Sequence, residues 1–471
     1  FKYRPPSAPV AGTRILAAVS GAAAGAASLI YTLTVTRRLP TQDLALLTLY
    51  NSAYAVAAAV VGYATTWYPR VLAKDPGRLP ELAAAGILVA LAAVIPLAAY
   101  LALYGRPDPV LLALGTISLI ILAWPVGAYI AIYKQRLSVV ANFANQLIKI
   151  AGAYAIRNNP SVYAVIGISI IISLPQILTK LVKPRFRNIF NIIKTFIKGA
   201  PYQTLYLVTV SAGGLITYAT LLAGGDKLLS YSFIFFQLGK SIFPAMTILS
   251  LMYGSLLKEH DKLRRALFDG AITLYLVTAL AVIMAKTPQW YIAILRPAEL
   301  NNTELLTAVE LNAYTFLLWG INIHLDTVPK GVEEKEIFTL RDKPAKAMLF
   351  DLTTTLLNAA LTYILSKTYG AVGLVLAPII PLTLSIAYRN YLLGRGYIPL
   401  TTKLYLPAIL TLITTEIAPI PLPPFSTSTL LETIIGFVPT FTVLATITAL
   451  TMLALSPPVR QLLKKLIKAT I

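Results

Sequence analysis

The sequence contains no cysteine and only two histidines, His260 and His324. The absence of cysteine excludes disulfide frameworks, cysteine zinc sites and thiol catalysis. Two histidines are too few for a histidine metal cluster. A G-x-x-x-x-G-K-[ST] loop is also missing, so the chain does not hydrolyse ATP through a P-loop. We therefore expect no cofactor and no metal.

Charged residues are scarce as well. They make up 13% of the chain, against about 25% in soluble domains. Apolar residues make up 57% and the mean hydropathy is +0.72, a composition that would expose too much apolar surface in water. The 40 Lys and Arg outnumber 19 Asp and Glu. In a membrane protein this excess indicates cytoplasmic loops that face anionic lipid, so we expect membrane lipids and no nucleic acid as partners.

Long apolar runs fill most of the chain. A membrane-spanning helix needs about 20 mostly apolar residues, and short connections leave no room for a soluble domain. The sequence therefore predicts an all-α polytopic membrane protein. Its fourteen expected spans are 13–36, 43–69, 82–104, 110–133, 138–156, 161–179, 199–223, 228–257, 266–288, 303–328, 346–366, 370–388, 404–422 and 430–456.

The distribution of Lys and Arg predicts the orientation of these spans. With the N-terminus placed in the cytoplasm, 30 of them fall in inner segments and 8 in outer segments. The remaining two, Lys149 and Lys240, lie near the middle of spans. Because cytoplasmic loops carry the excess of basic residues, we expect a plasma (cytoplasmic) membrane protein with both termini in the cytoplasm.

A weak internal repeat suggests two halves of six spans each. We therefore expect an N-terminal bundle (1–182), a basic cytoplasmic linker (183–198), a C-terminal bundle (199–395) and a region of two extra helices with a basic tail (396–471). A shift of 209 residues superimposes Lys134 on Lys343, Asn142 on Asp351, Lys149 on Asn358 and Tyr154 on Tyr363.

Two spans carry a row of polar residues around a lysine at membrane depth. A spacing of i, i+3, i+4 and i+7 places such residues on one helix face. Charge is costly inside hydrocarbon, so these residues are expected to face a cavity or a partner. Two lysines in opposite halves would form a cationic chamber for a phosphate headgroup. The expected ligands are Asn142, Asn145, Gln146 and Lys149 in the first half, and Gln237 and Lys240 in the second.

Alternatives exist for each of these groups. Three carboxylates inside spans, Glu310, Asp351 and Glu416, could neutralise the lysines, or could instead couple transport to H+ or Na+, because desolvation raises the pKa of a carboxyl group. Arg14 is expected either to attract a headgroup at the cytoplasmic entrance or to anchor the first span. Arg38, in a predicted outer segment, is either a headgroup contact on the exit side or an interface anchor.

Three segments together resemble a known family. They are TVTRRLPTQDLALLTLYNSAYAVAAAVVGYATTWYPRVLAK (34–74), DKLLSYSFIFFQLGKSIFPAMTILSLMYGSLLKE (226–259) and KPAKAMLFDLTTTLLNAALTYILSKTYGAVGLVLAP (343–378). They resemble polysaccharide and lipid-linked oligosaccharide flippases of the multidrug/oligosaccharidyl-lipid/polysaccharide (MOP) exporter superfamily. The residues matched by position are Arg38, Asp43, Lys343, Asn358, Gly370 and Gly373. The glycines and Asp43 are interpreted as turn residues rather than ligands.

The resemblance implies two six-helix bundles around a central cavity. The chain departs from this pattern by having fourteen rather than twelve expected spans, with two additional C-terminal helices. The resemblance also implies alternating access that carries a polyprenyl-(pyro)phosphate-linked oligosaccharide from the cytoplasmic to the outer leaflet, without enzymatic activity. Glycan-assembly enzymes are further candidate partners. The chain also departs from the family pattern where Pro40 directly follows Leu39 without the usual glycine, and where the neutral run TYATLL occupies 217–222.

Two other functions remain open. A cation-coupled multidrug exporter of the same superfamily would use a carboxylate pair in one lobe and a mainly apolar cavity. An integral membrane glycosyltransferase or ligase acting on lipid-linked sugars would need an acidic motif or a catalytic His or Arg in an outer loop. The acidic motif at 259–261 instead lies among basic residues of an inner loop, and the longest outer segment offers only Arg296 and Glu299.

Overall fold

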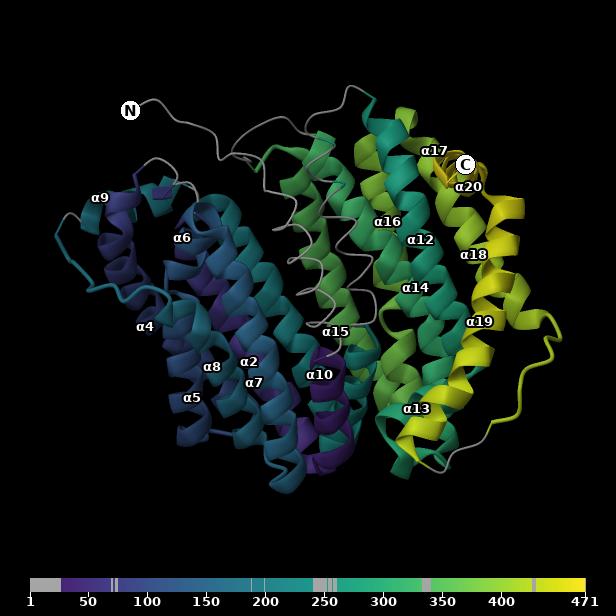
Figure 1. The fold of residues 1–471 in the computed structure, drawn as a ribbon, viewed down its shortest axis with the longest axis horizontal. Coiled ribbons are helices and arrows are strands. Elements are labelled where there is room, and N and C mark those ends of the chain that lie inside the picture. The colour runs from purple at the N-terminus through teal and green to yellow at the C-terminus, as the bar shows by residue number, and fades with distance from the viewer. Residues whose placement is uncertain are drawn as a thin grey trace. The chain divides into compact units, whose positions relative to one another are not determined.

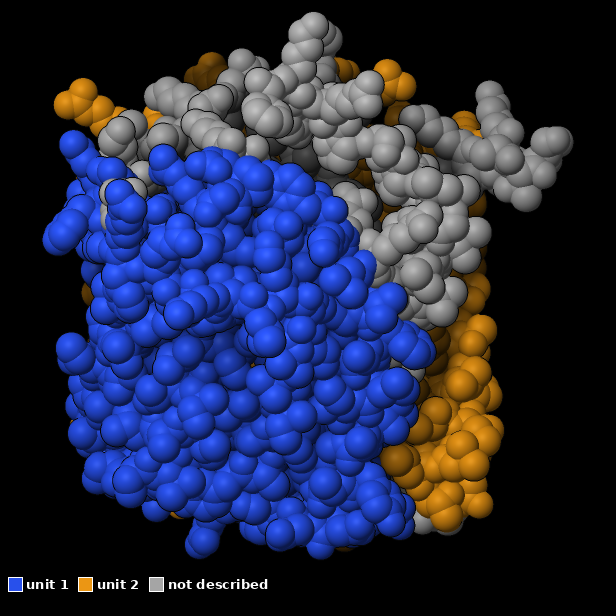
Figure 2. All heavy atoms as spheres, turned by 60° about the vertical axis from the view of Figure 1, so that its left-hand side comes forward, with its two compact units in different colours: residues 1–210 blue, residues 211–471 orange. Residues whose placement is uncertain are grey.

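The computed structural model describes residues 27–470 except 69–70, 73–74, 188, 199, 240–251, 253–255, 257–260, 333–339 and 426–428. The chain divides into two compact units, Phe1–Val210 and Ser211–Ile471, called unit 1 and unit 2 below (Figure 2). Each unit is a bundle of helices, and the described residues contain no strand. The expected all-α polytopic fold is therefore confirmed.

Unit 1 consists of helices packed largely through small residues. Helix α2 packs against α4, α4 against α5, and both α5 and α7 against α8 (Figure 1). Buried alanines on α2 and α4 let the two backbones approach closely, as is typical of membrane helices. The elements are a helix at 27–38, α2 (Thr41–Thr65), η1 (Pro76–Arg78), α4 (Leu79–Leu103), α5 (Pro109–Leu122), α6 (Val126–Tyr133), α7 (Gln135–Asn158), α8 (Val162–Leu178), α9 (Ile189–Lys198) and the first part of α10 (Ala200–Gly239).

The segment expected to be a basic linker contains helix α9. Its residues Ile189, Ile192 and Phe196 recur at intervals of three and four and form one apolar face. That face packs with Tyr68 and Leu82 into a buried cluster at the start of α4. The linker therefore includes a helix that is part of the core of unit 1.

Unit 2 is built around α12, which packs against α14, α18, α19 and α20. Helix α14 also packs against α15 and α16, and α18 lies beside α19 (Figure 1). The elements are α12 (Lys262–Lys286), α13 (Pro288–Leu295), η3 (Pro297–Glu299), α14 (Thr303–Val332), α15 (Lys343–Leu376), α16 (Ile379–Leu393), η4 (Arg395–Tyr397), α17 (Ile398–Leu400), the π-helical turn η5 (Thr401–Tyr405), α18 (Leu406–Ile417), α19 (Leu430–Leu455) and α20 (Pro457–Thr470).

The predicted turn role of Gly370 is confirmed. This residue has a φ of 57° and interrupts α15 between two expected spans. A Cβ atom there would meet Glu304 Oε1 at 2.1 Å, and the same oxygen accepts a hydrogen bond from the Ala371 N–H at 2.7 Å. Only glycine fits this close approach without strain.

Acidic residues join helix ends in unit 1 as well. Asp43, in the first turn of α2, accepts a hydrogen bond from the Val162 N–H at 3.2 Å. Asp108 caps α5 and accepts a hydrogen bond from the Tyr163 hydroxyl at 2.6 Å. Burial by itself would raise the pKa of Asp108, but the hydrogen bonds from the Tyr163 hydroxyl and two backbone N–H groups lower it overall. Both carboxylates therefore hold the start of α8.

Eight helical stretches of the described residues are long and apolar enough to cross a membrane. Two of them, Ala200–Gly239 and Lys343–Leu393, each include parts of two expected spans. Helices α7 and α14 are as long as the others, but polar side chains interrupt their apolar sequence. The structure therefore has helices at the expected spans from the second to the fourteenth wherever it describes them.

The lack of cysteine allows a direct test of the predicted orientation. Asn301 and Lys183 are exposed and lie in an expected outer and inner segment respectively. In intact cells we expect a membrane-impermeant maleimide to label Asn301→Cys, and to label Lys183→Cys only after permeabilisation. The parent chain, which has no thiol, is the control. The opposite labelling pattern would reverse the assignment of both termini to the cytoplasm.

Candidate functional site

Helix α7 presents the row of polar side chains that the sequence predicts. Asn145 and Gln146 are each 8% exposed, and Asn142 and Lys149 are half-buried. The Gln146 amide nitrogen donates a hydrogen bond to the Asn142 carbonyl at 3.0 Å. The Gln146 Oε1 atom is buried and has no hydrogen-bond partner among the described residues. Asn145 lies against the carbonyl oxygens of Ile172 and Ala141, to which its amide nitrogen can donate.

Lys149 is held by a hydroxyl rather than by a carboxylate. Its ammonium group donates a hydrogen bond to Ser28 Oγ, in helix 27–38, at 3.0 Å. Within the described part of the chain, no carboxylate lies at ion-pair distance from Lys149. A single hydroxyl replaces little of the hydration that a half-buried ammonium group loses. Lys149 therefore keeps most of its capacity to bind an anion.

The positions of the acidic residues in unit 1 explain this lack of a counterion. The unit has four of them, and they are Asp43, Asp75, Glu81 and Asp108. Each lies at the start of a helix, either in the first turn or at the N-cap, where a negative charge is favourable. The three carboxylates expected as possible partners of the lysines, Glu310, Asp351 and Glu416, all belong to unit 2, and none forms an ion pair with Lys149 among the described residues.

The two units carry matching polar pairs at the predicted shift of 209 residues. In unit 1, Gln176 of α8 donates a hydrogen bond to Asn142 Oδ1 of α7 at 2.7 Å. In unit 2, Ser385 of α16 donates one to Asp351 Oδ1 of α15 at 2.8 Å. The shift that superimposes Asn142 on Asp351 also superimposes Gln176 on Ser385. The repeat is therefore visible in contacts as well as in sequence.

Asp351, one of the three expected ion-coupling carboxylates, lies in a partly buried ionic cluster. Arg389 of α16 is 3% exposed and forms a salt bridge with Asp351. Its Nη1 donates to Asn322 Oδ1 of α14 at 2.8 Å, and its Nη2 lies 3.4 Å from Asp326 Oδ1. Lys330 contacts Asp326 at 2.5 Å. Two cations and two carboxylates balance, so the cluster joins α14, α15 and α16 without net charge.

The other two expected carboxylates, Glu310 and Glu416, lie near each other in unit 2. Glu310 of α14 is within electrostatic range of Glu416 of α18 and of Lys286 of α12. The Tyr314 hydroxyl donates a hydrogen bond to Glu416. Lys286 donates to the backbone carbonyls of Glu416 at 2.5 Å and Ala418 at 3.0 Å. Two half-buried carboxylates with one lysine and one phenol can hold a proton or a small cation.

The remaining expected ligands are distributed as follows. Gln237 of α10 is buried, and its Oε1 atom has no partner among the described residues. Arg38 is exposed at the end of helix 27–38. Arg14 and Lys240 lie outside the described residues. Substrate binding by these residues stays a prediction.

Several residues of these clusters were missed by sequence reasoning. Arg389 was counted as an inner-loop charge because the expected span ended at 388, whereas α16 continues to Leu393. Ser28 and Tyr314 carry no motif, and a hydroxyl in a membrane helix is common. The repeat itself provided a signal for Gln176, because the shift that matches Asn142 to Asp351 also pairs it with Ser385.

No protein-family model and no curated protein matches the chain. Solved structures do match it. A lipid II flippase, MurJ, in an inward closed conformation has a TM-score of 0.65 at 12% identity, covering 93% of this chain and 99% of that chain. An inward-facing multidrug resistance MATE family transporter of the MOP superfamily has a TM-score of 0.53 at 13% identity, covering 77% and 93%.

The outward-facing conformation of a MATE family transporter has a TM-score of 0.51 at 14% identity, covering 85% of this chain and 94% of that chain. The chain therefore has the fold of MOP-superfamily transporters, as the sequence resemblance indicated. These neighbours are transporters and not enzymes, and the chain is a multi-pass membrane protein of the same architecture.

The buried side chain of Arg389 predicts a marked effect on stability. Removing one partner of a fully buried ion pair costs about 3–5 kcal/mol, and the 24% exposure of the Asp351 side chain makes the cost smaller here. We expect Arg389→Met to lower the thermal unfolding midpoint far more than Arg395→Met, which removes an exposed charge just after α16. Asp351→Asn combined with Arg389→Gln should cost less than the sum of the single changes. Additive single effects would show that Arg389 and Asp351 are not coupled.

Proposed function

We propose that the protein is a flippase that moves a polyprenyl-(pyro)phosphate-linked oligosaccharide from the cytoplasmic to the outer leaflet by alternating access. The observation that carries this proposal is Lys149, a half-buried lysine inside an expected span with a hydroxyl but no carboxylate partner among the described residues. A charge in that position costs free energy unless it serves a ligand. An anionic lipid headgroup supplies the missing charge.

The chemistry of α7 suits such a headgroup. The Lys149 ammonium group would bind a phosphate oxygen by a charge-assisted hydrogen bond. Gln146, one turn away, has a buried oxygen without a partner, and leaving such an atom unsatisfied costs about 1–3 kcal/mol. A sugar hydroxyl that donates to this oxygen would recover that cost. The headgroup would thus meet one cation and a row of amides while its isoprenoid tail stays in the bilayer.

The structural neighbours support the same class of substrate. MurJ, whose name gives lipid II as its cargo, matches with a higher TM-score and over more of the chain than the MATE transporters reported above. Flipping requires no covalent chemistry. The protein need only lower the cost of moving a charged headgroup through hydrocarbon, which a polar path with a fixed cation does.

The decisive variant is Lys149→Ala in proteoliposomes. We expect translocation of a polyprenyl-phosphate sugar with a fluorescent reporter to slow at least about tenfold, because a hydrogen bond to a charged group is worth about 1.5–3 kcal/mol. Lys149→Arg should keep much of the rate. Lys134→Ala, which removes an exposed lysine just before α7, is the matched control. Equal rates for Lys149→Ala and the control would refute the ligand role.

A second candidate function is cation-coupled multidrug export, and the pair of Glu310 and Glu416 favours it. These carboxylates lie close to each other and to Tyr314 and Lys286, so the site can take up one positive charge and release it. In a flippase the same site would couple translocation to H+ or Na+. The two functions differ in cargo and in their dependence on Lys149.

Glu310→Gln and Glu416→Gln separate the two functions when both cargoes are measured. We expect an imposed H+ or Na+ gradient to accelerate glycolipid translocation by the parent protein, and either variant to lose that acceleration while keeping the basal rate. Glu432→Gln, an exposed carboxylate in the capping box of α19, should behave like the parent. Gradient-driven uptake of an aromatic cation that needs Glu310 but not Lys149 would identify an exporter instead.

A further inference from the structure

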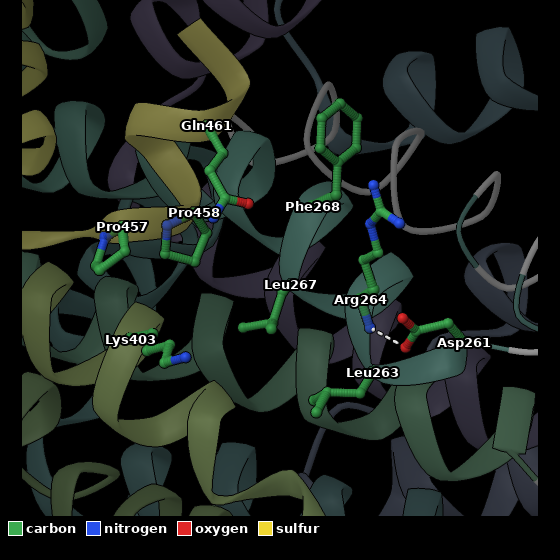
Figure 3. A pocket seen from close by; sticks show the side chains of 9 residues that line it. All are labelled: Asp261, Leu263, Arg264, Leu267, Phe268, Lys403, Pro457, Pro458 and Gln461. Carbon is green, nitrogen blue, oxygen red and sulfur yellow. Dashed lines mark hydrogen bonds between the residues drawn. The ribbon is translucent and has the colours of Figure 1, made fainter. Parts of the chain in front are cut away.

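A pocket in unit 2 lies where α12, the turn η5 and helix α20 meet (Figure 3). It encloses about 270 Å³, which is near the roughly 300 Å³ at the small end of ligand sites. Three apolar stretches begin or end beside it, namely Lys262–Lys286, Arg395–Ile417 and Leu430–Leu455. The pocket therefore lies at the level where the hydrocarbon of the bilayer meets water.

The lining of the pocket is amphipathic. The side chains of Leu263, Leu267 and Phe268 on α12 and the rings of Pro457 and Pro458 on α20 supply its apolar part. Lys403 and Gln461 lie on one side, and Arg264 lies on the α12 side beside Phe268, as Figure 3 shows. We call Arg264 and Lys403 the rim of the pocket and its apolar side chains the floor. A lining that combines cations with apolar side chains suits a molecule with a charged head and an apolar tail.

The two cations of the rim are available for a ligand. Arg264 and Lys403 are exposed, and among the residues that the structure describes neither side chain has an ion pair or hydrogen bond. The one carboxylate of the lining, Asp261, is already engaged as the N-cap of α12, where it accepts a hydrogen bond from the Arg264 N–H at 2.9 Å. The net charge of the rim is therefore positive.

Two features of the backbone fix this geometry. Lys403 lies in a π-helical turn, Thr401–Tyr405, and such turns are frequent at functional sites. The carbonyl of Lys403 accepts a hydrogen bond at 2.7 Å from the hydroxyl of Ser456, which is fully buried at the junction of α19 and α20. Helix α20 continues the positive rim with exposed Arg460 and Lys464.

We propose that this pocket binds the phosphate of an anionic phospholipid, with its glycerol and first methylenes on the apolar floor. The site is separate from the row of polar residues on α7 and takes a resident lipid rather than the cargo. A cavity volume of about 270 Å³ is sufficient for a phosphate with a glycerol backbone. On the predicted topology the lipid belongs to the cytoplasmic leaflet, whose anionic lipids attract basic segments near the membrane.

The test is lipid binding to the full-length purified protein by native mass spectrometry. We expect one phosphatidylglycerol to bind more tightly than phosphatidylcholine, and the Arg264→Gln, Lys403→Gln double variant to weaken its binding by at least about tenfold, because both lost groups make charge-assisted contacts. Lys134→Gln with Lys183→Gln removes the same charge from exposed positions of unit 1 and should leave binding unchanged. The single variant Lys403→Arg, which keeps the positive charge, should retain most of the affinity that Lys403→Gln loses.

Other outcomes overturn the proposal. If the control pair weakens binding as much as the pocket pair, the effect is one of net charge. If inorganic phosphate alone binds with the same dependence on Arg264 and Lys403, and phosphatidylglycerol does not, the pocket takes a free anion. Leu267→Trp fills the apolar floor and leaves the rim charges in place, so it should weaken binding of the lipid. Unchanged lipid binding would show that the apolar side chains do not contact the lipid.

Discussion

Placing a charged side chain in hydrocarbon costs free energy, and the two units place their charged residues differently. In unit 1 the four acidic residues lie at helix starts, where backbone N–H groups and water stabilise them. No carboxylate of that unit lies deeper in a helix than its first turn, and Lys149 has no carboxylate partner among the described residues. In unit 2 the charges inside the bundle come in opposed sets, with Arg389 facing Asp351 and Asp326. The pair of Glu310 and Glu416 in unit 2 is an exception, because two carboxylates there lie near a single lysine, Lys286.

Equivalent positions of the internal repeat carry different polar contacts in the two units. An amide pair, Asn142 with Gln176, occupies the place that Asp351 and Ser385 occupy in the second unit. Amides hold two helices together by hydrogen bonds worth about 0.6–2 kcal/mol each in a membrane. A buried ion pair holds them more firmly once formed and is costly to break. The α7–α8 pair is therefore joined here by a neutral hydrogen bond, and α7 also carries the candidate ligand residues.

The sequence predicted the positions of the spans well, because an apolar run of about 20 residues has few alternatives. It also predicted the turn at Gly370 and the polar row on α7, since glycine and helical spacing leave direct signals.

The sequence did not predict which polar groups contact each other. Arg389 lies one residue beyond an expected span, so positive-inside reasoning counted it with the loop. The contact of Tyr314 with Glu416 joins residues 102 apart in sequence, and no local pattern encodes that pairing. Helix α9 was missed because its basic residues hid a short apolar face.

The unsatisfied oxygen of Gln146 provides a physical reason for specificity. Its amide nitrogen is already committed to the Asn142 carbonyl, so the oxygen can be satisfied only by an incoming donor. Lys149, three residues further along the same face, supplies a positive charge and no acceptor. A ligand that satisfies both must combine an anion with a nearby hydroxyl or amide donor. A phosphate attached to a sugar has both groups, whereas an aromatic cation lacks the anion and would be repelled by the ammonium group. On the proposed function, the charge of Lys149 would thus disfavour cationic exporter substrates, and the Lys149 ammonium group and the Gln146 oxygen together would favour glycosyl phosphates.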